Sequence, residues 1–409
     1  MFRALHTSDW HLGHMLRNRF DRAAEHDAFL AWLLEQIATH EADALLVAGD
    51  IYQTSNPPAH AEQRFYDFLA RLRGVAPDTD VVIIAGNHDS ASRLQAARGL
   101  YGAIGVHVVG ALPVGSDLSA AVVRLEGRTG SVCVAAVPFL RPSDLSPELV
   151  REGGLAAGVE ERYRSTLELA RSRRQTDDAL IVMGHGHLLG GHTSEHSERD
   201  LVRGNEDALP LTIFGDDFSY AALGHLHLAQ SVEGGPAPVR YCGSPIPLSM
   251  GEASYPHQVL RVDFEGRDVS QIVPLLIPRA VELVRIGAGD AKPLDETLQT
   301  LREYDFGELR QPAFQPMLEV SVFIDAPTPD LNEQVHAAIA ERGVRLVRIH
   351  PVRAASMETR LGDTLVETDL SDLDPEHVLI EMHRLRHDSP PRDELLRAFR
   401  ELRAEVEAR

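Results

Sequence analysis

The chain has 409 residues, of which 44% are hydrophobic, and its formal net charge at pH 7 is −21. This length predicts two to three domains. The strong negative charge disfavours unaided binding to nucleic acid, because an acidic protein needs local positive charge, metal ions or a basic partner for that task. No apolar run is long enough for a membrane span. The opening stretch MFRALHTSDWHLG also lacks the features of a signal peptide.

Cys133 and Cys242 are the only cysteines, and each lies in or beside a strand-like segment. We therefore expect two reduced, buried thiols rather than a disulfide. This use of cysteine is typical of the reducing cytoplasm, and we expect a cytoplasmic protein with no membrane association.

Residues 1–275 alternate apolar strand-like segments with helix-like segments. FRALHTSD and ADALLVAGD predict strands, and residues 22–40 and 61–73 carry apolar side chains at helical spacing. Further strands are predicted at VVIIAGNHD, SVCVAAVPFL, DALIVMGH, SYAALGHLH and VRYCGSPI. Strands that are apolar throughout are buried on both faces of a sheet. The pattern predicts a layered α/β domain with functional loops at the strand ends.

Residues 279–354 have a different pattern and predict a second, smaller α+β domain. Three strands (RAVELVRIG, PMLEVSVFID and VRLVRIHPV) alternate with two helices (PLDETLQTLREYDF and PDLNEQVHAAIAERG) in a β-α-β-α-β order. An acidic, irregular linker follows, and residues 375–409 predict a helical hairpin whose last helix has one apolar stripe. Such a hairpin either packs on its own domain or docks on a partner.

Polar residues that can bind metal ions follow five of the predicted apolar strands. They are Asp9 and His11; Asp50; Asn87, His88 and Asp89; His185; and His225 and His227. A lone Gly-Asp or Gly-His pair carries little information, but five sites in order, most of them behind a glycine, indicate one shared site. Glycine lets the backbone turn sharply at such positions.

Carboxylate, amide and imidazole groups without thiolate suit divalent ions such as Mn²⁺, Fe²⁺ or Zn²⁺. In an extended D-x-H segment the first and third side chains point to the same side, so Asp9 and His11 can hold one ion. Seven ligands from this set are too many for one tetrahedral site. They fit two ions that share a carboxylate, an arrangement used for displacement at phosphorus.

The ordered series D-x-H, G-D, G-N-H-D, G-H and G-H-x-H resembles the calcineurin-like metallophosphoesterase superfamily. HTSDWHLGH, VAGDIYQTSNPP, IIAGNHDS and RYCGSPIPLS further resemble the bacterial SbcD nucleases, relatives of the MRE nucleases. The resemblance implies a layered β-sandwich flanked by helices, a smaller α+β capping domain and C-terminal helices. It also implies two-metal hydrolysis of DNA phosphodiesters in repair and recombination, as an exonuclease on duplex ends and an endonuclease on single-stranded or hairpin DNA.

The same resemblance implies the role of each site residue. The metal ligands would be Asp9, His11 and His227 on a first ion, Asn87, His185 and His225 on a second, and Asp50 between them. The activating ion would be Mn²⁺. His88 would act on the scissile phosphate, stabilising the transition state or protonating the leaving 3′-oxygen. Asp89 would either orient the ring of His88 or cap the following turn.

The segment VMGHGHLLGGH leaves one assignment open. We favour His185 as the ligand, because it directly follows the predicted strand. His187 is the alternative, since it can be aligned with the G-H-L form of the family. His192 is expected at the surface or near the substrate.

Residues beside the first motif have weaker predictions. His14 could contact the substrate. Arg17, Arg19 and Arg22 form a basic cluster that is either a solvated helix start or a contact for the phosphate backbone.

The resemblance implies a coiled-coil ATPase of the SbcC type as a partner, DNA as a second partner, and a homodimer. Partner and metals would then supply the positive charge that the chain lacks. A phosphoesterase of small molecules and a catalytically silent scaffold are the alternatives. The residues after the first domain disfavour the former, and the unbroken ligand set disfavours the latter.

Overall fold

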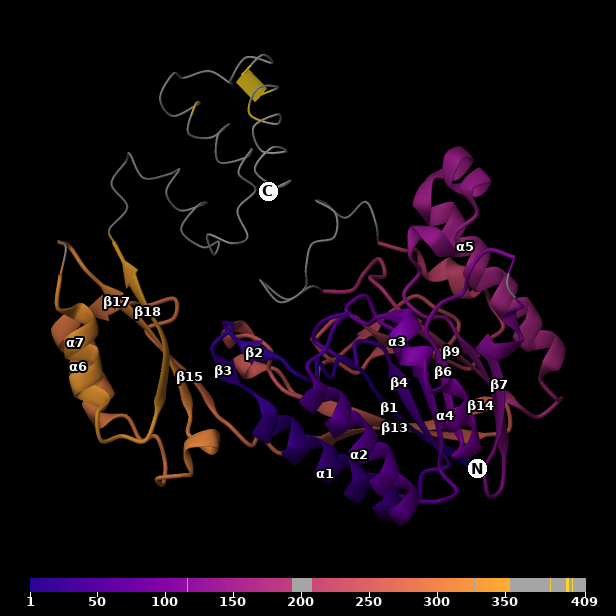
Figure 1. Cartoon of the computed structure of the whole chain (residues 1–409), viewed down its shortest axis with the longest axis horizontal. Coiled ribbons are helices and arrows are strands. Elements are labelled where there is room, and N and C mark those ends of the chain that lie inside the picture. The colour runs from indigo at the N-terminus through magenta and orange to yellow at the C-terminus, as the bar shows by residue number, and fades with distance from the viewer. Residues whose placement is uncertain are drawn as a thin grey trace. The chain divides into compact units, whose positions relative to one another are not determined.

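The computed structural model describes residues 1–115, 117–192, 208–326 and 328–353, and the single positions 383, 395, 396 and 399 (Figure 1). The predicted linker and nearly all of the predicted C-terminal hairpin lie outside these residues. The chain divides into two compact units, Met1–Val322 with Asp330–His350, and Phe323–Pro329 with Pro351–Arg409. Among the described residues, no helix is both long and apolar enough to span a bilayer.

The first unit contains two six-stranded sheets. The strands of the first are, in spatial order, β14 (Asp268–Leu276), β13 (Gln258–Glu265), β1 (Phe2–Thr7), β4 (Ala44–Ala48), β5 (Asp80–Ile84) and β6 (Val106–Val109). Those of the second are β11 (Gln230–Val232), β12 (Val239–Tyr241), β10 (Tyr220–Gly224), β9 (Ala179–His185), β8 (Ser131–Ala136) and β7 (Val122–Glu126). Strands β1, β4, β5 and β6 run parallel in the first sheet, and β8, β9, β10 and β12 run parallel in the second.

Alternating side chains explain why the central strands are apolar throughout. In β4, Leu46 and Ala48 belong to the apolar core that contains the second sheet, whereas Leu45 and Val47 pack in a core with helices α1 (Ala23–Thr39) and α2 (Ala59–Val75). Successive side chains of a strand point to opposite faces, so both faces of the first sheet are buried. The predicted sandwich flanked by helices is confirmed.

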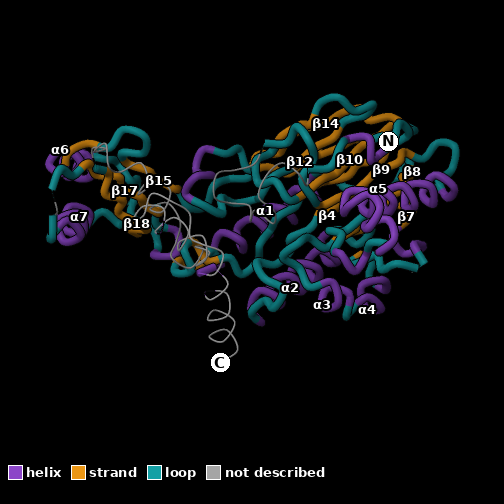
Figure 2. Tube along the Cα trace, turned by 90° about the horizontal axis from the view of Figure 1, so that it is seen from above, coloured by secondary structure: helices purple, strands orange, loops and turns teal. Residues whose placement is uncertain are grey.

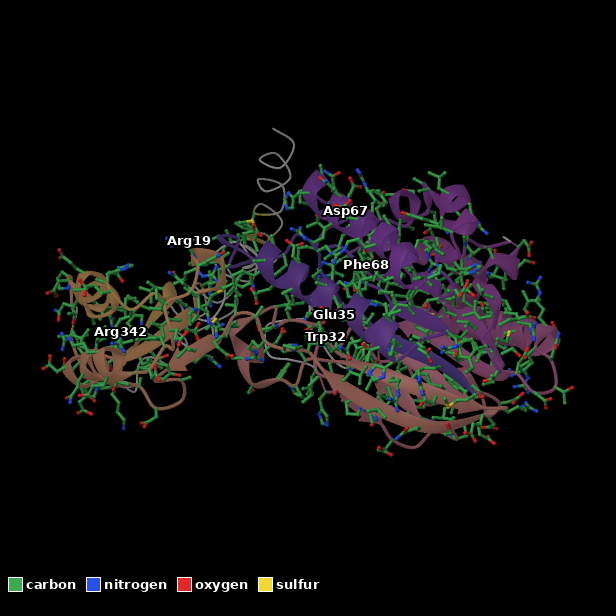
Figure 3. The ribbon with its side chains drawn as sticks, turned by 90° about the horizontal axis from the view of Figure 1, so that it is seen from below. Arg19, Trp32, Glu35, Asp67, Phe68 and Arg342 are labelled. Atoms are coloured by element: carbon green, nitrogen blue, oxygen red, sulfur yellow. The ribbon has the colours of Figure 1, made fainter. Side chains whose placement is uncertain are left out.

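Helices cover the outer faces. Figure 2 shows α2, α3 (Ala91–Gln95) and α4 (Arg98–Ala103) on one side of the strand layers. Figure 3 labels Phe68 on α2 and Trp32 on α1, and these two helices are in contact. Helix α5 (Pro147–Arg173), which strand patterning does not reveal, packs against β7, β8 and β9. Both cysteines are free and buried, as predicted.

Short elements complete the loops. They are β2 (Met15–Leu16), β3 (Phe20–Asp21) and the 3-10 helices η1 (Leu118–Ala121), η2 (Pro142–Asp144), η4 (Leu211–Phe214), η5 (Met250–Ser254) and η6 (Pro312–Phe314). Helix η5 lies in the loop between β12 and β13, and it carries a carboxylate that reaches the candidate site.

The predicted smaller α+β region has β17 (Met317–Phe323) as its central strand. Its other elements are β15 (Leu283–Ile286), β16 (Lys292–Pro293), α6 (Leu294–Glu303), α7 (Leu331–Ile339) and β18 (Arg345–Val352). β15 runs parallel to β17, β16 and β18 also pair with β17, and α6 contacts α7. The β-α-β-α-β order is present with one added short strand, β16. The predicted boundary between residues 275 and 279 stays a prediction.

Candidate metal centre

The residues predicted from the ordered series converge at one edge of the two sheets. Asp9 follows β1, Asp50 follows β4, Asn87 follows β5, His185 ends β9 and His225 follows β10. β1, β4 and β5 run parallel to one another in the first sheet, β9 and β10 do so in the second, and the two sheets pack face to face. The carboxyl ends of parallel strands meet at one edge, which is where ligands bind in layered α/β folds.

The loops after β1 and β4 run side by side beyond the sheet. The amide of Asp9 donates to Gly49 (3.0 Å), and the amide of His11 donates to Asp50 (3.0 Å). Asp9, His11 and Asp50 all have positive φ, of 53°, 46° and 50°. The expectation that D-x-H is extended is therefore wrong: the loop turns at both residues, and main-chain pairing to the β4 loop holds the turn in place.

Glycines beside the candidate ligands serve two different purposes. Gly49 has a φ of 90°, which suits the sharp turn into Asp50. Close approach also requires glycine at Gly49, where an added Cβ would collide with the ring of His185, and it is the reason for Gly86 and Gly224. An added Cβ would lie 2.1 Å from the Asp50 carboxylate at Gly86, and 2.0 Å from the Ala48 carbonyl at Gly224. Any side chain there would push the loops of the cluster apart.

Asp9, His11 and His227 form the first candidate group, with one ligand atom from each within 4.8 Å of the others. All three side chains are buried. Neither ring nitrogen of the buried His11 makes a hydrogen bond among the described residues, and Nε2 lies near a carboxylate oxygen of Asp50. A buried imidazole without hydrogen bonds is costly unless it binds something, so this group fits a cation.

Asp50 connects the first group to the second. Its Oδ2 atom lies 3.5 Å from Nε2 of His11 and 3.4 Å from Nε2 of His185. Asp9, Asp50 and His185 again bring their ligand atoms within 4.8 Å. Asn87 completes this side, with Oδ1 at 3.0 Å from Nε2 of His185 and 3.2 Å from Nδ1 of His225. The donor set fits two cations with one carboxylate between them.

His185 is oriented by the main chain. Its Nδ1 donates to the carbonyl of Ala48 at 2.8 Å, which leaves Nε2 facing Asp50 and Asn87. A hydrogen bond at one ring nitrogen fixes the tautomer and makes the other nitrogen the ligand. His187 lies outside every candidate group among the described residues, and its Nε2 is 3.4 Å from the carbonyl of Gly191. His192 is exposed.

His88 lies at the rim of the cluster and is half-buried. Its amide donates to Oδ1 of Asp50 (2.9 Å), and its Nδ1 donates to the carbonyl of Gln53 (2.7 Å). The ring packs edge-on against His11, with 4.8 Å between centroids. His11, Asp50 and His88 also bring ligand atoms within 4.8 Å. The geometry therefore permits ligation by His88 as well as the predicted role on the phosphate.

Asp89 caps the loop. Its carboxylate accepts three main-chain amides, from Gly86 (2.9 Å), Ile51 (3.1 Å) and Tyr52 (3.0 Å). Of the two predicted roles, the structure favours the cap, since the Nδ1 of His88 contacts Gln53 instead. Asp89 thereby ties the β4 loop to the β5 loop.

The residues near the first motif differ in their surroundings. His14 contacts the side chain of Gln53 (2.9 Å), and burial lowers the pKa of His14 to about 4. Arg17 lies 3.7 Å from Glu319. Arg22 is fully buried, pairs with Glu25 and donates to the carbonyl of Pro247 (2.7 Å). The predicted basic cluster is therefore wrong in one member: Arg22 cannot reach a phosphate backbone.

Protons compete with cations for this cluster. Burial raises the pKa of Asp9 to about 6, although His185 and His227 oppose the shift. Burial disfavours the charged form of His185, but Asp50 and Asp9 outweigh it and raise its pKa to about 9. A raised pKa keeps the proton bound up to a higher pH, and ligands bind metal only when deprotonated.

The affinity for Mn²⁺ is therefore expected to rise as the pH increases from about 6 to about 9, with proton release on binding. Calorimetric titration of Mn²⁺ into the metal-stripped chain, in buffers of different ionisation enthalpy, measures the released protons. An affinity that stays constant over this range, with no proton release, would contradict the expectation.

Comparison with known proteins identifies the family. The calcineurin-like phosphoesterase family matches residues 2–229, more than half of the chain, and the "Type 5 capsule protein repressor C-terminal domain" family matches residues 279–387. The chain is 36% identical over 384 residues to the SbcD subunit of the nuclease SbcCD from Rhodobacter capsulatus, covering 91% of this chain and 92% of that protein. The chain belongs to the SbcD family of calcineurin-like phosphoesterases.

Other SbcD proteins are similar over most of their length. The SbcD protein of Escherichia coli K12 is 31% identical over 383 residues, covering 92% of this chain and 91% of that protein. The Bacillus subtilis protein is 34% identical over 307 residues, covering 74% and 75%. The predicted family is thereby confirmed, and the Asp/His cluster is a plausible dinuclear metal site of this SbcD chain.

One residue of the site was not predicted. Glu252, on η5, is fully buried and lies 3.2 Å from Nδ1 of His227. It stands 25 residues after that histidine and belongs to no motif. The only sign of it in the sequence was a single carboxylate inside the apolar stretch PIPLSMGEA. That sign is too weak to predict a hydrogen-bond partner for His227.

Proposed function

We propose that this chain is the nuclease subunit of an SbcCD-type complex and hydrolyses DNA phosphodiesters with two metal ions. The observation that carries the proposal is the convergence of the seven candidate ligand side chains, five of them buried, at one edge of the sheets, in a chain similar to SbcD proteins along nearly its whole length. The proposed activity is exonuclease action on duplex ends and endonuclease action on single-stranded or hairpin DNA, in repair and recombination.

The proposed ligands are Asp9, His11 and His227 for one ion, Asn87, His185 and His225 for the other, and Asp50 for both. The chemistry that two bound ions supply at such a site is Lewis-acid stabilisation of charge on the phosphate. The chain itself must hold these ligands at fixed spacing, and the paired loops after β1 and β4 support that task. Mn²⁺ is the proposed ion; oxygen and imidazole donors also accept Fe²⁺ or Zn²⁺.

His88 is the proposed catalytic residue. The carbonyl of Gln53 holds the proton on Nδ1, so the opposite nitrogen is available for the phosphate. An imidazole there can stabilise charge in the transition state or give a proton to the leaving 3′-oxygen. His14 contacts the side chain of the same Gln53, so its proposed influence on the substrate is indirect.

Alanine at His185 is expected to remove one of two bound Mn²⁺ ions at near-stoichiometric concentrations, whereas alanine at His187 is expected to leave both. The reason is that Nε2 of His185 faces Asp50 and Asn87, while His187 contacts Gly191. Equilibrium dialysis with metal analysis measures the occupancy. The reverse pattern would reassign the ligand to His187.

The proposed partner is an ATPase of the SbcC type, because the relatives are named as one subunit of the nuclease SbcCD. A net charge of −21 also favours a basic partner for DNA binding. The predicted docking segment is residues 375–409, and a homodimer is proposed as the working state.

A cleavage assay tests the proposed function. Purified chain with Mn²⁺ should cut a DNA hairpin, and should degrade duplex ends when the SbcC-type ATPase and ATP are added. Metal-stripped chain is the control. Turnover of a small phosphodiester such as bis(p-nitrophenyl) phosphate, with no DNA cleavage under any of these conditions, would favour the small-molecule phosphoesterase instead.

A further inference from the structure

Glu252, on η5, contacts the proposed metal ligand His227. Its Oε1 lies 3.2 Å from Nδ1 of His227 and accepts from the hydroxyl of Ser249 (3.3 Å), while Oε2 accepts the amide of Leu248 (2.8 Å). Glu252 is fully buried, and His227 is 5% exposed. Three donors thus hold one carboxylate in a single orientation.

Each contact of the buried Glu252 carboxylate is with a group that can donate a hydrogen bond: the His227 ring, the Ser249 hydroxyl and the Leu248 amide. A buried carboxylate is costly unless it is paired and hydrogen-bonded. Its retention beside His227 indicates a role that a neutral side chain would not fill.

Helix η5 fixes Glu252 in place. Met250, at the start of this helix, is buried in an apolar cluster with Val281 and Met317. Arg279 donates to the carbonyls of Ala253 and Tyr255 at the other end of the helix. Contacts at both ends thus prevent the carboxylate from moving away from His227.

We propose that Glu252 is a positioning residue for His227: it accepts the Nδ1 proton, fixes the tautomer and makes Nε2 the ligating nitrogen. His185 has the same arrangement with the carbonyl of Ala48. A carboxylate also raises the basicity of the imidazole, which a carbonyl does less strongly. The inference rests on the proposed role of His227 as a ligand of the first ion. Loss of Glu252 is therefore expected to weaken the binding of that ion only.

The variant Glu252→Gln keeps the size of the side chain and removes its charge. Calorimetric titration of Mn²⁺ into the metal-stripped full chain is expected to show one of the two ions weakened about 10- to 100-fold, the usual cost of losing such a partner. The other ion should be nearly unaffected. Co²⁺ substitution gives a second readout, because its visible absorption reports the ligand field and is expected to change at one site.

Glu265→Gln is the matched control, because it makes the same charge change at an exposed position. Glu265 is the last residue of β13 and lies opposite Asp268 of β14 in the strand register. This end of β13 lies beside Phe2, at the start of β1, whereas the cluster follows the other end of β1. Glu252→Asp retains the charge and should recover part of the affinity. If circular dichroism shows that Glu252→Gln is unfolded, the titration of Glu252→Asp replaces it: weaker binding of one ion supports the inference, and wild-type binding of both ions contradicts it.

Two results would overturn the inference. Two ions bound by Glu252→Gln as tightly as by Glu265→Gln would remove the role of Glu252 and leave the proposed function intact. A wild-type chain that binds no Mn²⁺ would overturn the proposed function and this inference with it.

Discussion

Alanine at His88 is expected to lower DNA cleavage by about 10²- to 10⁴-fold while both Mn²⁺ ions stay bound. The reason is the position of the ring. It lies at the half-buried rim of the cluster, and its Nδ1 is held by the carbonyl of Gln53. Removing the ring takes away the group that would act on the phosphate. The seven proposed ligands remain.

Two measurements on the same preparation check this result: the single-turnover rate on hairpin DNA and the number of bound ions. His60→Ala is a matched control, since His60 is exposed on α2. Full activity of His88→Ala would remove the catalytic role. Loss of an ion would make His88 a ligand, which its distance to His11 and Asp50 permits.

Asparagine at Asp50 is expected to weaken both ions and to lower cleavage on the order of 10³-fold or more. One oxygen of Asp50 lies 3.5 Å from Nε2 of His11 and 3.4 Å from Nε2 of His185, so it stands between the two groups. A neutral amide supplies no charge for either ion. Asn87, by comparison, contacts only His185 and His225 of the second group.

Asparagine suits this experiment because it tolerates the positive φ of 50° at position 50. The fold should therefore survive, as thermal unfolding of the metal-stripped protein can verify. Asp67→Asn is the control, because Asp67 is exposed on α2 (Figure 3). Dialysis then counts the ions in each variant. Two tightly bound ions in Asp50→Asn would show that Asp50 is not shared.

The set of candidate site residues was predictable because each of these residues follows its strand after only a few positions in the chain. Asp50 stands two residues after β4, and His185 is the last residue of β9. Apolar strands are recognisable from composition, and parallel strands bring their carboxyl ends to one edge. Local spacing was therefore sufficient to group residues that are far apart in the chain.

Predictions from local spacing were wrong where the backbone conformation, or a residue far away in the sequence, determines the position of a side chain. Asp9 and His11 come together through two turns at positive φ, not through an extended strand. Arg22 looked like part of a basic surface, but Glu25 and the loop at Pro247 bury it. Burial and positive φ at non-glycine residues result from packing between loops, which a single segment does not contain.

The amino-acid sequence by itself determined the family, the layered sheets and the ordered set of carboxylates and imidazoles, because these depend on composition and on spacing along the chain. Only the tertiary structure decided which nitrogen of each histidine faces the cluster. Ala48 orients His185, and Glu252 contacts His227 from a separate helix. Such hydrogen bonds join segments that folding brings together. The orientation and tautomer of each imidazole ring therefore depend on partners that no local sequence pattern reveals.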